Sequence, residues 1–298
     1  MLFRFAALLL VVSACRATTP ANTGDATPAG VATWMGAKPR TPAESRRVVS
    51  LAPNITEILF AVGAGQRVVG VTRYCDEPPE ARSRTNVGGF LDPNIEAIVS
   101  LKPDVVMAVP NSGNRDVVEK LAAWGIPVLA LRIESVATLR EAMKVVGEAV
   151  GESERAERAV KSIDARIERA RGAVMRREKL RALLVVGREP TVVAGRGTFL
   201  DELLSIVGGE NAITTPLFPT LTAEAVDAAR PDRIIDVADR GEGAQPPEAY
   251  WARIRLPPGG RIIHESSTAM RRISPRVGTT IDVLYRALWS NPIAGDAR

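Results

Sequence analysis

The sequence predicts an α/β protein of two lobes, each with a parallel sheet flanked by helices, joined by one long backbone helix. Three observations carry this prediction. Strand-like and helix-like segments alternate on both sides of residues 152–178, these residues form one long charged helical pattern, and a similar motif occurs before and after them. We therefore expect an N-terminal lobe at 46–151, the backbone helix at 152–178 and a C-terminal lobe at 179–298.

The pattern at 152–178 is a narrow apolar stripe among charged residues. Its apolar positions recur at spacings of four and three: Ala156, Val160, Ile163, Ile167, Ala170 and Val174. Such a stripe predicts a helix that rests one face on the rest of the protein. A coiled coil is the alternative, but the stripe lasts under four heptads and uses alanine at several positions. Roughly 26 residues at 1.5 Å each predict a rod of about 39 Å.

A repeated motif on either side of this helix indicates two lobes of similar design. Glu96 and Glu224 each stand seven residues before a Pro-Asp pair that leads into a β-branched run. Phe90 and Phe218 each stand six residues before the glutamate. A common helix–Pro-Asp–strand connection could produce part of this match by chance. The agreement at one register favours a repeated unit.

The N-terminus has the features of an export signal. Residues 5–12 are an uninterrupted apolar run, too short to span a membrane but of the size of a signal-peptide core. Small residues followed by Cys15 resemble a bacterial lipoprotein signal, so we expect a signal peptide at 1–14 and lipidation of Cys15; an ordinary secretory signal is the alternative. Residues 15–45 predict a flexible tether, in which no role is found for Trp34.

In the first lobe we expect strands at 48–51, 68–71, 105–109 and 128–131, and helices at 54–62, from 92 onward, at 116–124 and up to 150. Asn54 with Glu57 matches a capping box, and Asp92 precedes a proline suited to a first helical position. Ser135 or Thr138 opens the last helix. The loop that begins at Tyr74 follows the second strand.

The second lobe repeats this alternation. We expect strands at 181–186, 191–194, 233–237 and 261–264. Helices are expected to begin at Thr198, Thr222 and Ser274, each of which is a residue type that caps helix N-termini. Strands alternating with helices predict a parallel sheet covered on both faces.

Composition and motifs argue against most enzyme chemistry. The net charge of +5 is spread along the chain, so nucleic-acid binding is not expected. His264 is the one histidine, which excludes a histidine-rich metal site, and Cys75 is expected to be a small buried residue. Gly195 and Gly197 give half of a dinucleotide-binding fingerprint, for which a plain turn before a helix is the simpler interpretation. We expect no catalytic residue, metal or cofactor.

A cleft between the lobes is the expected functional site. Ligands of parallel α/β sheets bind beyond the carboxyl ends of the strands, and Tyr74, Phe90 and Phe218 stand in loops at such positions. Each could instead pack in the core, but as a group they suit the walls of a cleft for a large, rigid ligand. Glu96 and Glu224 open their helices, where the helix dipole favours an acid. Their matched placement also suits arginines on a partner.

Five segments carry a resemblance to a known family: 49–57, 69–79, 94–104, 208–211 and 274–276. They resemble the periplasmic cobalamin-binding proteins of ABC importers and, more broadly, the class that serves cobalamin, ferric siderophores and haem. The resemblance implies two Rossmann-like lobes, a single backbone helix, limited closure and a ligand held between the lobes of a monomer.

The resemblance also implies roles for individual residues. Tyr74 and Arg272 match a tyrosine and an arginine of the cleft. Phe90 and Phe218 stand where the cobalamin binders have tryptophans, and Glu96 and Glu224 match acids that dock on permease arginines. This sequence departs from the cobalamin binders at three positions: both tryptophans are phenylalanine, and Pro110 stands where a further aromatic is expected.

We therefore expect a periplasmic, membrane-anchored lipoprotein that captures cobalamin and delivers it to an ABC permease. A ferric siderophore or haem is the alternative ligand. Two other classes are weighed: a dinucleotide-dependent enzyme that uses Gly195 and Gly197, and a structural lipoprotein without a small ligand.

Overall fold

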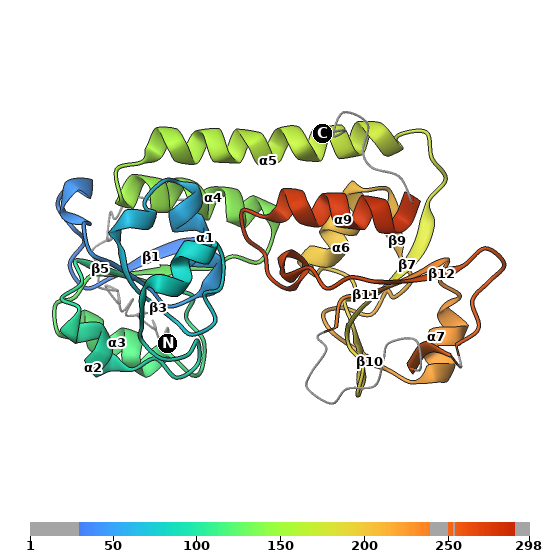
Figure 1. Ribbon diagram of the computed structural model, residues 1–298, viewed down its shortest axis with the longest axis horizontal. Helices are drawn as coiled ribbons and strands as arrows, with labels where there is room; N and C mark the ends of the chain where they lie inside the picture. Colours follow the sequence, from blue (N-terminus) through green and yellow to red (C-terminus); the bar gives the residue numbers. More distant parts are fainter. Residues whose placement is uncertain (1–29, 239–249, 253, 290–298) are drawn as a thin grey trace, which may run out of the picture.

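The computed structural model describes residues 30–238, 250–252 and 254–289. Two α/β lobes lie side by side, and α5 (Ser153–Val174) runs along the top of both (Figure 1). The expected signal peptide at 1–14 and Cys15 lie outside the described residues. Both the two-lobe prediction and the single backbone helix are confirmed.

The first lobe contains a six-stranded sheet in the order β1-β6-β5-β2-β3-β4. Its strands are β1 (Ala32–Met35), β2 (Val48–Ser50), β3 (Val68–Val71), β4 (Thr85–Asn86), β5 (Val105–Ala108) and β6 (Val128–Leu131). Strands β2 to β6 pair in parallel, as expected. Their side chains are mostly buried, which is typical of a parallel sheet with both faces covered.

Strand β1 corrects the prediction that residues 15–45 are a tether throughout. Ala32–Met35 pairs antiparallel with β6, so that Trp34 lies opposite Leu129. Trp34 is half-buried and packs against the hydrophobic core, which accounts for this residue. The strand is held by backbone pairing at the sheet edge, and its sequence shows no alternation of apolar and polar residues that could have indicated it.

Four helices cover the first sheet: α1 (Pro53–Ala61), α2 (Ile95–Ser100), α3 (Arg115–Ala123) and α4 (Val136–Ala149). The predicted caps are right in one case and wrong in two. Ser135 caps α4 in a capping box with Thr138. Helix α1 begins at Pro53 without a side-chain cap, and Asn94 rather than Asp92 caps α2.

The second lobe contains a sheet in the order β10-β8-β7-β11-β12, with β9 paired to β7. Its strands are β7 (Leu180–Gly187), β8 (Thr191–Val193), β9 (Gly209–Asn211), β10 (Thr220–Leu221), β11 (Arg233–Asp236) and β12 (Arg261–His264). Strands β7, β9, β11 and β12 pair in parallel. Strands β8 and β10 form an antiparallel edge, which the sequence pattern did not predict.

The helices of the second lobe are α6 (Phe199–Ile206), α7 (Ala223–Ala229) and α9 (Val277–Trp289). The side chains of Thr198 and Thr222 accept hydrogen bonds from backbone N–H groups and cap α6 and α7, as predicted. Helix α9 follows Ser274 and buries the expected stripe: Val277, Ile281, Leu284 and Leu288.

Helix α5 joins the hydrophobic cores of the two lobes. It is 22 residues long, about 33 Å, and thus shorter than expected. Its buried residues are those of the predicted stripe: Ala156, Val160, Ile163, Ile167 and Ala170. Helices α4 and α9 lie beneath its two halves (Figure 1). Arg166 of α5 pairs with Asp282 of α9, and Arg140 of α4 lies 2.5 Å from Asp164 of α5, so polar contacts fix the rod to both lobes.

Candidate ligand-binding cleft between the lobes

A pocket of about 690 Å³ lies where the first lobe meets the second. Its first-lobe wall consists of Pro53, Asn54, Arg73, Tyr74, Phe90, Leu91, Asp92 and Val109, and the second lobe contributes Arg272. Tyr74 and Leu91 are more than half exposed. The structure thus brings three of the four predicted ligand-binding residues, Tyr74, Phe90 and Arg272, around one opening.

Two loops at the carboxyl ends of parallel strands position these residues. The backbone N–H of Arg73, which follows β3, donates to the carbonyl of Gly88 (2.9 Å) and joins the Tyr74 loop to the Phe90 loop. Gly88 has a φ of +99°, and a Cβ there would come within 2.7 Å of backbone atoms of Asp92 and Asn94. Glycine is therefore required for the turn that presents Phe90.

Arg73 forms part of the pocket rim. Its guanidinium lies 5.1 Å from the centre of the Tyr74 ring, and its Nη2 contacts both carboxylate oxygens of Asp92 at 2.9 Å. These contacts hold the phenol ring of Tyr74 between two loops. The rim of the pocket therefore presents the aromatic ring of Tyr74, and the charges of Arg73 and Asp92 beside it neutralise each other.

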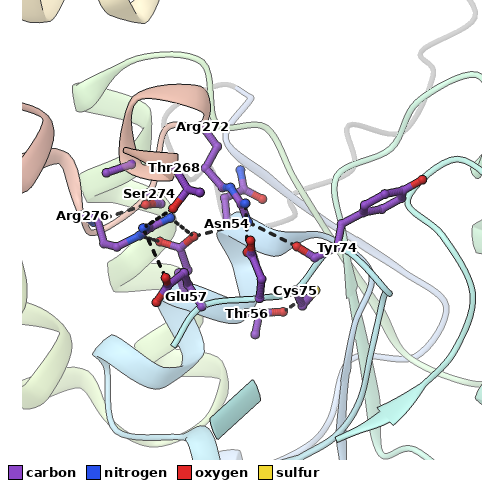
Figure 2. Close-up of polar contacts among 12 residues, drawn as sticks. Asn54, Thr56, Glu57, Tyr74, Cys75, Thr268, Arg272, Ser274 and Arg276 are labelled. Atoms are coloured by element: carbon purple, nitrogen blue, oxygen red, sulfur yellow. Dashed lines mark hydrogen bonds and ion pairs between the residues drawn. The ribbon is translucent and has the colours of Figure 1, made fainter. Parts of the chain in front are cut away.

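Arg272 reaches the pocket from the second lobe and is held there by the first. Its Nη1 donates to the carbonyl of Tyr74 at 3.4 Å (Figure 2). Its Nη2 lies 2.9 Å from Oδ1 of Asp76. The contact with Asp76 is an ion pair without hydrogen-bond alignment. A second contact joins Nη1 to Oε1 of Glu57 at 3.6 Å.

A buried ion pair beside Arg272 crosses between the lobes. Arg276, just before α9, donates through Nε (2.7 Å) and Nη2 (3.0 Å) to the two oxygens of Glu57 on α1 (Figure 2). Its Nη1 donates to Thr268 (2.9 Å) and lies 3.9 Å from Glu77. Only 3% of the Glu57 side chain is exposed. Sequence analysis assigned Glu57 to a capping box because its partner stands 219 residues away.

Phe218 lies on a second pocket, of about 240 Å³, in the second lobe. The lining residues are Val186, Phe199, Leu200, Phe218, Val237, Met270 and Arg271. Phe218 is about half exposed, and Leu217 beside it is 67% exposed with a φ of +62°. Leu217 therefore lies in the left-handed region that residues other than glycine seldom adopt, as do Lys102 and Arg230. The two pockets are adjacent along the chain, because Arg271 lines one and Arg272 the other.

Glu96 and Glu224 occupy matched positions on α2 and α7. Both are exposed in the first turn of their helices, and the two helices lie at the lower ends of the lobes, on the side away from α5 (Figure 1). Hydrogen bonds from its own backbone N–H and from Thr222 lower the pKa of Glu224, which keeps it charged. The structure therefore places both acids on one outer edge of the molecule, as expected.

The residues weighed for other chemistry have structural roles. Gly197 has its backbone N–H bound by Asp201 (2.9 Å), so the start of α6 is already occupied by a carboxylate and does not form a phosphate site. Cys75 is buried, accepts hydrogen bonds from Thr56 and contacts Thr72; burial raises the pKa of its thiol. Nδ1 of His264, at the end of β12, lies 3.4 Å from Oδ2 of Asp236.

In the part of the chain that the structure describes, no three histidine, cysteine, aspartate or glutamate side chains are grouped to hold a metal ion. No helix within 30–238, 250–252 and 254–289 has the length and apolar character needed to cross a bilayer.

Comparisons with known proteins agree with this geometry. The family model described as periplasmic binding protein matches residues 48–245, about two thirds of the chain. The chain belongs to this family, whose members bind substrates for transport, and it is not an enzyme. Within the family it falls in the class that binds cobalamin, haem and siderophores outside the cytoplasm for ABC importers.

Individual relatives cover nearly the whole chain. The vitamin B12-binding protein of Salmonella paratyphi A is 30% identical over 257 residues, which are 86% of this chain and 92% of the relative. An uncharacterized ABC transporter substrate-binding lipoprotein of Bacillus subtilis, YvrC, is 28% identical over 83% of this chain and 81% of its own.

Solved structures share the fold. The periplasmic heme-binding protein RhuT from Roseiflexus sp. RS-1 has a TM-score of 0.72 and 30% identity, covering 83% of this chain and 98% of that one. The vitamin B12-binding protein BtuF of Vibrio cholerae has a TM-score of 0.70 and 22% identity, with coverage of 82% and 96%.

Proposed function

We propose that this protein captures cobalamin between its lobes and delivers it to an ABC permease. The observation that carries the proposal is the inter-lobe pocket, which is lined by Tyr74 and Phe90 of the first lobe and by Arg272 of the second. Flat apolar walls with few polar groups suit a rigid macrocycle. Curated relatives named vitamin B12-binding protein, 29–30% identical over most of the chain, support the corrinoid as the ligand.

The ligand extends along the segment 270–272 onto the second pocket. Phe218 then contacts the macrocycle from the second lobe as Phe90 does from the first. Phenylalanine at both positions preserves an apolar wall, so the absence of tryptophan does not remove the stacking surface.

Delivery uses the outer edge of the two lobes. The exposed carboxylates of Glu96 and Glu224 pair with arginines on the two halves of the permease. The attachment of α5 to both lobes limits their relative movement, so ligand release depends on the transporter. A lipid on Cys15 holds the processed protein at the membrane, which is in keeping with the resemblance to a relative named as a lipoprotein.

Haem is the second candidate ligand, because the haem-binding protein RhuT is as similar in sequence as the cobalamin-binding relatives. The exposed phenol of Tyr74 is a possible iron ligand in that case. A ferric siderophore is the third candidate of the same class.

Calorimetry with purified protein tests the proposal. Cyanocobalamin should bind one to one with a Kd below about 1 μM. Ferric haem, followed by its absorption spectrum, is the matched comparison, and a ferric siderophore is the other. Absence of heat with tens of micromolar cyanocobalamin, together with a haem or siderophore titration that saturates, would transfer the assignment to that ligand.

A further inference from the structure

Among the second-lobe residues that the structure describes, Arg272 is the one that lines the inter-lobe pocket, and acidic side chains surround it. Asp76 lies 2.9 Å from its Nη2 and Glu57 lies 3.6 Å from its Nη1. Arg276 and Glu77 complete a continuous cluster, with 3.9 Å between them. Figure 2 shows Arg272 and Arg276 converging on Glu57 from the second lobe.

The formal charge of this cluster is negative. The ion pairs join three carboxylates, Glu57, Asp76 and Glu77, to two guanidinium groups, so the sum over these five groups is −1. The guanidinium of Arg82 donates to the backbone carbonyl of Asp76 (3.0 Å) and takes no part in these ion pairs. The other charges of the pocket cancel, because Arg73 and Asp92 pair with each other. An additional carboxylate brought to Arg272 would therefore meet a site whose positive charge is already compensated.

Arg272 nevertheless retains the ability to donate hydrogen bonds. Its Nη1 donates to the carbonyl of Tyr74, and within the described residues its Nε contacts no acceptor. About a fifth of its side chain is exposed, at the wall of the pocket. A neutral oxygen acceptor can use such a donor without adding a fourth negative charge.

We propose, given a macrocyclic ligand as in the proposed function, that Asp76 and Glu57 position Arg272 and compensate its charge, so that the pocket selects neutral oxygen acceptors over carboxylates. A corrinoid carries side-chain carboxamides, whereas haem carries two propionates. The cluster thus favours an amide-bearing macrocycle. Asp76 and Glu57 are positioning residues, and Arg272 donates the hydrogen bond to the ligand.

A carboxylate and an amide carbonyl differ in what they gain and lose beside Arg272. A carboxylate gains a charge-assisted hydrogen bond from Arg272 but is repelled by Asp76 and Glu57, which occupy the same guanidinium. An amide carbonyl gains a weaker hydrogen bond and meets little repulsion. Removal of one acid should therefore improve carboxylate binding more than amide binding.

The experiment compares neutral and acidic forms of each macrocycle. Calorimetry measures cyanocobalamin against its three monocarboxylic acids, and a parallel titration measures haem against its dimethyl ester. In the unmodified protein, cyanocobalamin should bind at least about tenfold tighter than at least one of its monocarboxylic acids, or the dimethyl ester of haem at least about tenfold tighter than haem itself. Asp76→Asn should reduce this ratio at least threefold.

Three variants control the interpretation. Glu210→Gln removes the same charge from an exposed pair with Arg181 at β9, and it should leave the ratio unchanged. Glu77→Gln removes an acid that lies 3.9 Å from Arg276, so it should shift the ratio in the same direction by less. This variant replaces Asp76→Asn if that variant folds poorly. Arg272→Gln removes the donor and leaves the acids uncompensated, so it should weaken binding of the acidic forms at least as much as binding of the neutral forms, and the preference should not fall. Thermal melting of each variant separates selectivity from stability.

The outcomes are distinct. If the acidic forms bind as tightly as the neutral forms, or if Asp76→Asn and Glu77→Gln leave the ratio unchanged, the inference is wrong. If haem binds and cyanocobalamin does not, the proposed ligand is wrong, and the ratio for haem and its ester still tests the role of Asp76. If neither macrocycle binds, both proposals are overturned.

Discussion

Loss of Arg276 should destabilise the protein more than loss of its partner Glu57. Replacement of Arg276 by methionine leaves the Glu57 carboxylate buried, with Arg272 at 3.6 Å as the nearest remaining cation. Breaking a buried ion pair in this way costs about 3–5 kcal/mol. The remaining contact with Arg272 and the 25% exposure of Arg276 place the expected cost of Arg276→Met at about 3 kcal/mol.

The reverse change should cost less. Glu57→Gln keeps the volume of the side chain and removes the negative charge. Arg276 then retains its hydrogen bond to Thr268, the nearby carboxylate of Glu77 and access to solvent. The expected cost is about 1.5 kcal/mol, the lower end of the range for a hydrogen bond to a charged group.

Thermal unfolding measures this asymmetry. With about 2–4 °C per kcal/mol for a protein of this size, Arg276→Met should lower Tm by about 6–12 °C and Glu57→Gln by about 3–6 °C. Arg158→Met is the matched control, because its pair with Glu154 is exposed on α5 and should contribute less than about 1 kcal/mol. An Arg276→Met variant within about 1 kcal/mol of the unmodified protein, or a larger effect of Glu57→Gln, would refute the reasoning.

Three further predictions concern the cleft, the outer edge and the buried thiol. Phe90→Ala combined with Phe218→Ala should weaken cyanocobalamin binding at least about tenfold by calorimetry; unchanged affinity would remove both rings from the ligand site. Glu96→Ala combined with Glu224→Ala should preserve ligand affinity and abolish stimulation of the permease in proteoliposomes, and full stimulation would reduce both acids to helix-dipole residues. Because burial raises the pKa of the Cys75 thiol, its alkylation, followed by mass spectrometry, should begin to accelerate at a higher pH than that of a free thiol; equal rates at each pH would contradict this.

The sequence alone predicted the features that depend on residues close to one another in the chain. The stripe on α5 was confirmed because its buried positions follow helical spacing, which local sequence displays directly. Thr198, Thr222 and Ser135 were recognised because a cap acts within three residues. The resemblance then gave Tyr74 and Arg272, which the structure places on one pocket.

Features that depend on distant residues could not be predicted. The bond from Arg276 to Glu57 joins residues 219 positions apart, so local reasoning assigned Glu57 to a helix cap. Strand β1 is defined by its pairing with β6 and has no periodicity of its own. Asn94 rather than Asp92 caps α2 because Pro93 still pairs with Gly88 and the backbone N–H of Asn94 donates to the carbonyl of Val87, so the helix begins after them.

A structure of the protein with bound ligand is the most direct test of the central claim, that the gap between the lobes is the binding site. After crystallisation with cyanocobalamin, the macrocycle should lie against Tyr74 and Phe90, with Phe218 and Arg272 contacting it from the second lobe. A ligand seated elsewhere, such as the groove of about 720 Å³ between Trp34 and α4, would contradict the account.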